Sequence, residues 1–142
     1  MDARARVAML AAALWWGSLS ATGFLAVPLL FAHLPTPALA GQTAAHLFTG
    51  QAWVGIACGV LLLAASRGRG ERARIDATLG FILAGVLLAL LGEFAVAPRI
   101  VARENLRLWH AVGSAMYLLQ WGCALVVLWR TTSQAVSPGG PS

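Results

Sequence analysis

The chain has 142 residues, of which 59% are hydrophobic and only 11% are charged. Soluble domains carry roughly a quarter of their residues as charged side chains, so this composition excludes an ordinary soluble protein and indicates a membrane protein. The net charge is +5. Because the arginines lie in short gaps between apolar runs, they favour lipid head groups as partners and give no indication of nucleic-acid binding.

Four apolar segments are long enough to cross a bilayer, whose hydrocarbon core needs a helix of about 20 residues. The sequence therefore predicts an all-α fold, an integral membrane four-helix bundle with an antiparallel, up-down arrangement. We expect its helices near residues 7–34, 44–65, 77–97 and 106–129, within a single domain at 1–130. The Ser-, Pro- and Gly-rich tail, 131–142, is expected to be disordered.

Local signals predict where the helices bend, begin and touch. Pro28 is expected to kink the first helix, and Thr36 is expected to cap the second helix, with Pro37 in its first turn. Small residues at four-residue spacing predict close helix packing, within one bundle or between copies. These pairs are Gly17 with Ala21, Gly55 with Gly59, Gly80 with Ala84, and Gly85 with Ala89.

The distribution of arginines predicts the orientation of the chain. Seven of the ten lie at the N-terminus, in the gap after the second helix, or at the C-terminus, whereas Arg99, Arg103 and Arg107 lie between the third and fourth helices. Arginine-rich gaps stay on the cytoplasmic side, so both termini are expected in the cytoplasm. The expected location is the bacterial inner (plasma) membrane, with the lipid bilayer as the main partner.

When the four helices are compared by depth in the membrane, each one has an ionisable group near the outer face. We predict a polar cavity open to the periplasm, formed by His33, His46, Glu93, Arg99 and His110. Glu93 lies in an apolar span and must be neutral, paired or hydrated, with Arg99 or His110 as its expected partner. The alternative is a structural ion pair that fixes the third helix against the fourth. Deeper polar residues are expected to hydrogen-bond between helices, namely Ser18, Thr22, Ser114, Tyr117 and Gln120.

Metal binding at this face is a second hypothesis. Imidazole suits iron, copper and zinc, so His46 and His110 are candidate metal ligands or axial ligands of a haem. Cys58 and Cys123 fall at similar depth, and thiols favour Cu(I), although buried cysteine also serves as a small apolar filler. No HExxH or CxxCH motif supports either site.

The segments LWWGSLSATGFLAVPLLFAHLPTPALAGQTAAHLF and RLWHAVGSAMYLLQWGCALVVLWR, residues 14–48 and 107–130, also resemble a known family. It is a group of short four-span bacterial membrane proteins of unknown function, related to the human transmembrane protein linked to cisplatin resistance. More distantly, the chain is similar in plan to the copper-resistance protein D membrane domain and to the four-span haem-containing protoporphyrinogen oxidase. These relatives imply a bundle with histidines near one membrane face. The oxidase's histidine early in its first helix has no counterpart in the apolar stretch 7–14, which argues against the haem enzyme.

These observations favour a small polytopic membrane protein without catalytic activity of its own, which handles a metal ion, a proton or a small ligand through the outer cavity. Two alternatives remain open. One is a haem-binding membrane oxidoreductase, and the other is a structural or assembly subunit that works with a second copy or another membrane protein.

Overall fold

The computed structural model describes residues 3–66 and 77–136, and their regular elements are helices that form four spans. Two spans contain a short π-helical segment, named η1 and η2, in which each N–H bonds to the carbonyl five residues earlier. The elements are α1 (Ala3–Ala21), η1 (Thr22–Ala26), α2 (Val27–His33), α3 (Pro37–Ser66), α4 (Ala77–Leu91), η2 (Gly92–Val96), α5 (Ala97–Val101) and α6 (Leu106–Val136).

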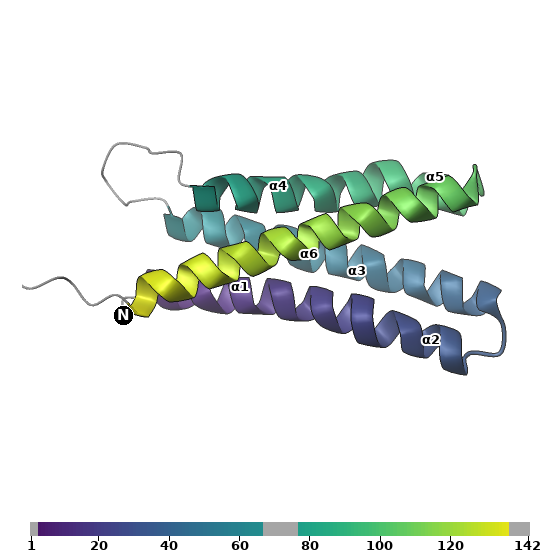
Figure 1. Ribbon diagram of the computed structural model, residues 1–142, viewed down its shortest axis with the longest axis horizontal. Helices are drawn as coiled ribbons and strands as arrows, with labels where there is room; N and C mark the ends of the chain where they lie inside the picture. Colours follow the sequence, from purple (N-terminus) through teal and green to yellow (C-terminus); the bar gives the residue numbers. More distant parts are fainter. Residues whose placement is uncertain (1–2, 67–76, 137–142) are drawn as a thin grey trace, which may run out of the picture.

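The four spans lie side by side in one elongated bundle (Figure 1). The connections 34–36 and 102–105 lie together at one end, on the right of Figure 1, which we name the hairpin end. Helices α1 and α4 each pack against both α3 and α6, so α1 and α4 occupy opposite corners of the bundle. Four of the described helical stretches are long and apolar enough to cross a membrane: 3–33, 37–66, 77–101 and 106–133.

The helix ends follow local chemistry. As expected, Thr36 caps α3, because the Leu39 N–H donates to Thr36 Oγ1 at 3.2 Å, and Pro37 begins the helix. Helix α3 then runs unbroken from Pro37, seven residues before the start predicted from sequence.

Helix α6 corrects the prediction of a disordered tail from residue 131, because it continues to Val136. The hydroxyls of Thr131 and Thr132 donate to the carbonyls of Val127 and Leu128 one turn back, so this polar stretch stays within the helix. The prediction for residues 137–142 lies outside the described residues.

The two π-helical segments each precede a proline and have the same cause. A proline lacks an N–H, and its ring crowds the carbonyl four residues earlier, here that of Phe24 for Pro28 and of Phe94 for Pro98. In both spans the chain inserts the wider π turn just before the proline, and the N–H of Val27 donates to the Thr22 carbonyl. The distortion predicted at Pro28 is therefore present as a π turn, and a second one occurs at Pro98.

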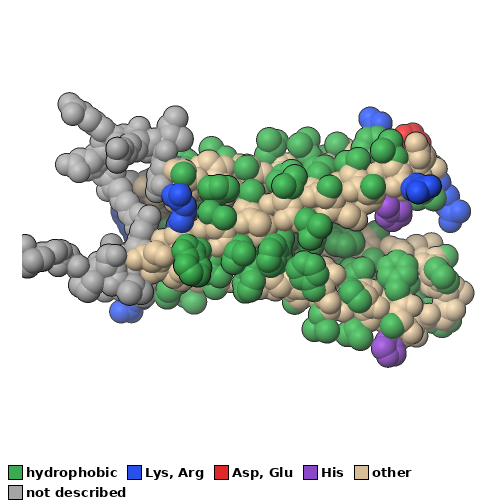
Figure 2. Space-filling view, in the orientation of Figure 1, with side chains coloured by type: hydrophobic (Ala, Val, Ile, Leu, Met, Phe, Trp, Pro, Cys, Tyr) green, Lys and Arg blue, Asp and Glu red, His purple; other side chains and the backbone are tan. Residues whose placement is uncertain are grey.

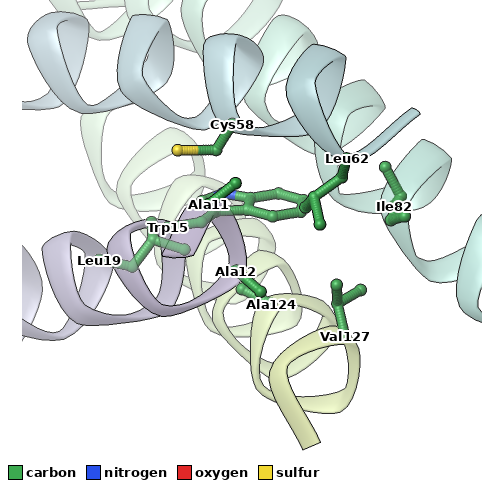
Figure 3. Packing of buried hydrophobic residues seen from close by; sticks show 9 residues of the cluster. All are labelled: Ala11, Ala12, Trp15, Leu19, Cys58, Leu62, Ile82, Ala124 and Val127. Atoms are coloured by element: carbon green, nitrogen blue, oxygen red, sulfur yellow. The ribbon is translucent and has the colours of Figure 1, made fainter. Parts of the chain in front are cut away.

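The indole of Trp15 forms the centre of the core (Figure 3). It is fully buried, and it is surrounded by small and branched side chains from all four spans. These are Ala11, Ala12, Leu19, Cys58, Leu62, Ile82, Ala124 and Val127. The deep tryptophan Trp15 thus serves as core packing.

Glycines let the helices approach closely around this centre. A Cβ at Gly85 would lie 2.6 Å from a ring carbon of Trp15, and a Cβ at Gly59 would collide with Val86. A Cβ at Gly17 or Gly80 would meet nothing within 4 Å. Of the predicted small-residue pairs, Gly55 with Gly59 and the pair that begins at Gly85 therefore lie at close helix contacts, whereas Gly17 and Gly80 do not.

The outer surface of the bundle is apolar along its length, and charged side chains gather at its two ends on the face shown in Figure 2. Large exposed side chains such as Leu10, Phe24, Leu87 and Leu119 lie on this surface. A lipid phase would cover such side chains, whereas water would not.

Candidate functional site

A half-buried carboxylate between two spans is the centre of the candidate site. Glu93 belongs to the π-helical segment η2, and the Thr49 hydroxyl on α3 lies 3.0 and 3.1 Å from its two carboxylate oxygens. The hydroxyl donates its single hydrogen to them. Because π turns frequently occur at functional sites and carboxylates are costly inside a membrane, Glu93 is the strongest candidate in the chain.

The partner of Glu93 differs from the one expected from sequence. Among the described residues, neither Arg99 nor His110 bonds to it, and the guanidinium of Arg99 lies over the ring of Trp109, 4.6 Å from its centroid. Arg99 is six residues after Glu93, so even in a regular helix it lies about 120° around the axis from Glu93 and the two side chains do not share a face.

The three histidines, His33, His46 and His110, are exposed, and within the described residues none of them bonds to Glu93. The Nδ1 of His33 lies 3.1 Å from the carbonyl of Leu29 and must donate to it, because a carbonyl only accepts. The outer cavity predicted from five residues therefore stays a prediction; of its members, Glu93 is held by a hydrogen bond from Thr49.

The buried face of α3 includes Gln51 and leaves His46 exposed. Its buried face carries Ala44, Gln51, Gly55, Cys58 and Leu62, which repeat at steps of three, four or seven residues. His46 lies two residues from Ala44, about 200° around the axis, and so faces outward. Sequence analysis overlooked Gln51 because most of α3 is apolar or small on every side.

The bundle opens at the hairpin end. Figure 2 shows a hollow there between the upper and lower parts of the molecule, with a histidine side chain at its rim. Helix α2 packs on α3, and α5 packs on α6, but within the described residues these two pairs make few contacts with each other. Deeper in the bundle, the rings of Phe48 on α3 and Tyr117 on α6 meet edge to face, 5.3 Å apart.

Below this aromatic pair lies a layer of polar side chains near the middle of the spans. The buried Gln51 donates to Ser18 at 3.0 Å and accepts from Thr22 at 3.3 Å, which links α3 to the first span. The Tyr117 hydroxyl donates to the Leu19 carbonyl at 2.8 Å. Of the polar residues expected in this role, Ser114 is exposed, and the Nε2 of buried Gln120 has no partner.

The cysteines lie among apolar groups. Cys58 is buried in the core against Trp15, and Cys123 is half-buried near Gly85; both thiols are free. Within residues 3–66 and 77–136, no group of three or more His, Cys, Asp or Glu side chains is placed to hold one metal ion. The copper and haem assignments stay predictions that rest on single side chains.

Four apolar spans in one bundle, with a carboxylate held between two of them, define the chain as a multi-pass membrane protein. A family model described as "Domain of unknown function (DUF4149)" matches residues 10–108, and the chain belongs to that family. No curated protein and no solved structure matches the chain. The match supports the membrane family of unknown function, and gives no support to the links with the cisplatin-resistance protein or with copper-resistance protein D.

The hydrogen bond between α3 and η2 gives a first testable prediction. Thr49→Val keeps the side-chain shape but removes the donor, so we expect a loss of about 1 to 2 kcal/mol in the free energy of unfolding. Denaturation of the purified protein in detergent measures it. Thr43→Val is the matched control, because Thr43 lies on the same helix and bonds only to its own backbone at Leu39. Equal losses in the two variants would contradict the role given to Thr49.

Proposed function

We propose that this protein binds and exchanges a small cation, a proton or a metal ion, at Glu93, reached from the hairpin end of the bundle. The observation that carries the proposal is the carboxylate itself. It is half-buried in a membrane span, and it receives a single hydrogen from Thr49. A carboxylate accepts at about four lone-pair positions, so most of its capacity remains available to a cation.

The surroundings support the same site. The hollow at the hairpin end in Figure 2 lies at the same end of the bundle as η2, which carries Glu93. Glu93 also lies in a π turn, a local geometry that frequently occurs at functional sites. The only neighbour that bonds to the carboxylate among the described residues is neutral, which leaves its charge unbalanced until a cation binds.

The proposed orientation places this site on the outer side of the membrane. We infer an antiparallel, up-down bundle with both termini in the cytoplasm, in a bacterial inner membrane, because the arginine-rich segments flank the end opposite the hairpins. The hairpin end then faces the periplasm. Relationships to the copper-resistance protein D domain and to the human cisplatin-resistance protein would fit metal handling, and they remain predictions.

The proposal is tested with the full-length protein in lipid nanodiscs, titrated separately with Cu²⁺, Zn²⁺ and H⁺ in a calorimeter. We expect the wild type to bind one of these cations, and Glu93→Gln to weaken that binding about tenfold or more, which corresponds to about 1.4 kcal/mol. Glu104→Gln is the matched control, because Glu104 is an exposed carboxylate in the 102–105 connection.

Two results would overturn the proposal. If Glu93→Gln binds all three cations as the wild type does, the carboxylate is not the site. If the wild type binds none of them, the result favours the alternative hypothesis of a structural or assembly subunit. An absorption spectrum of the same sample tests the haem oxidoreductase, which requires a Soret band.

A further inference from the structure

The polar layer around Gln51 divides the bundle into two halves along its length. The half between this layer and the hairpin end contains Glu93, the three histidines and both π-helical segments. The other half, which we name the far half, consists of residues 3–17, 52–66, 77–88 and 121–136. These four stretches are regular α-helix throughout. The distortions of the spans therefore lie on the side of the hairpin end.

The far half is filled by the apolar core around Trp15. Figure 3 shows the indole between side chains of α1, α3, α4 and α6, and Trp15 is 0% exposed. Among the described residues, the only buried polar side chains are Gln51 and Gln120, and both lie at the boundary between the two halves. The interior of the far half is therefore apolar.

Close approach of the helices removes the space that a hydrated ion would need in this half. A Cβ at Gly85 would lie 2.6 Å from a ring carbon of Trp15, and a Cβ at Gly59 would collide with Val86. Helix α4 thus meets α1 and α3 across glycines that have no side chain to keep them apart. Packed protein interiors leave few voids larger than a water molecule, so a core of this kind admits no ion together with its water shell.

A cation that left its water shell would need protein ligands along its way. Proton relays in membrane proteins are built from Asp, Glu and His side chains. The four stretches of the far half contain none of these residues. The histidines His33, His46 and His110 all lie on the other side of the polar layer, as Glu93 does. A cation at Glu93 therefore has no further ligand of this kind in the far half.

We propose that the far half seals the bundle, so that Glu93 exchanges its cation only with the solution at the hairpin end and the protein does not carry the cation across the membrane. This inference rests on the proposed cation binding at Glu93. An ion in the apolar core would lose its water without gaining a ligand, and such a loss is costly. The protein is then a one-sided cation binder and not a transporter.

The two cysteines of the chain report on the seal, because Cys58 and Cys123 both lie in the far half and have free thiols. The probe is a methanethiosulfonate that carries a sulfonate and therefore stays in water. It is added to the full-length protein in lipid nanodiscs, where both membrane faces meet water, and mass spectrometry counts the labels. We expect no label on the wild type. Thr49→Cys, nine residues before Cys58 on α3, should gain one label.

Opening the core should make a cysteine reactive. Cys58 belongs to the same core cluster as Trp15, so Trp15→Ala should allow the reagent to label Cys58. Trp129→Ala is the matched control, because Trp129 is 72% exposed and its loss leaves the core intact. A folded Trp15→Ala in which Cys58 stays unlabelled would overturn the part given to the indole. If Trp15→Ala does not fold, the wild type and Thr49→Cys still decide the test.

Cation entry into liposomes completes the test. With H⁺ or Zn²⁺ outside and an indicator dye inside, liposomes that contain the protein should show entry no faster than protein-free liposomes. Faster entry would overturn the proposal, as would a label on either cysteine of the folded wild type or an unlabelled Thr49→Cys. A failure of the proposed function is distinguishable, because it changes the calorimetric result and leaves the labelling pattern as expected.

Discussion

Replacing Trp15 by alanine should lower the free energy of unfolding by about 3 to 5 kcal/mol, the range for removing a large aromatic side chain from a packed core. The indole is fully buried and contacts residues from all four spans, so its loss leaves a cavity that no single helix shift can close. In a membrane this loss is mainly one of van der Waals packing, because lipid is as apolar as the core. Unfolding of the detergent-solubilised protein by SDS, followed by circular dichroism, measures the difference.

The matched control for this change is Trp129→Ala. Trp129 is 72% exposed near the end of the last span, and truncating it should cost much less than truncating Trp15. If the two alanine variants lose the same stability, Trp15 is not the centre of the core.

Enlarging Gly85 should be the second most damaging change. A Cβ at this position would lie 2.6 and 2.8 Å from two ring carbons of Trp15, so Gly85→Leu forces α4 away from α1 and should cost about 1 to 3 kcal/mol or more. The same denaturation experiment measures it. Gly80→Leu is the matched control on the same helix, because a Cβ at Gly80 meets nothing within 4 Å.

A double variant checks the cause of this effect. Trp15→Phe shortens the ring that occupies the space beside Gly85, so Trp15→Phe with Gly85→Ala should be more stable than the sum of the two single changes predicts. Contacting residues commonly show such coupling at about 0.5 to 3 kcal/mol. Strict additivity would mean that Gly85 does not act through the indole.

The spans were predictable because length and apolarity alone identify a membrane helix. The cap at Thr36 was predictable because a Thr-Pro pair at a helix start has a local mechanism. The helical structure of residues 131–136 was not predictable in this way, because the threonine hydroxyls there bond to carbonyls of the same helix and do not end it. The buried face of each helix was harder to predict. In a membrane the exterior is as apolar as the core, so periodicity did not distinguish the buried Gln51 from the exposed His46.

The candidate site was half predictable for a related reason. Glu93 was found because a carboxylate in an apolar run is costly. Its partner was missed because Thr49 is a neutral residue on another helix.

Segments η1 and η2 lie 70 residues apart, and each comes two residues before a proline. The position that corresponds to Glu93 in the first half is Gly23, and a Cβ there would lie 2.6 Å from the ring of Tyr117. The tyrosine fills the space that a side chain would take, and its hydroxyl bonds to the Leu19 carbonyl. One half therefore holds an ionisable group, and the equivalent place in the other half is closed by packing.

The most direct test of cation binding at Glu93 is infrared difference spectroscopy of the protein in nanodiscs, recorded before and after addition of acid, Cu²⁺ or Zn²⁺. A carboxylate band that responds to the cation should appear in the wild type and in Glu104→Gln, and should be absent from Glu93→Gln. Identical difference spectra for all three proteins would contradict cation binding at Glu93.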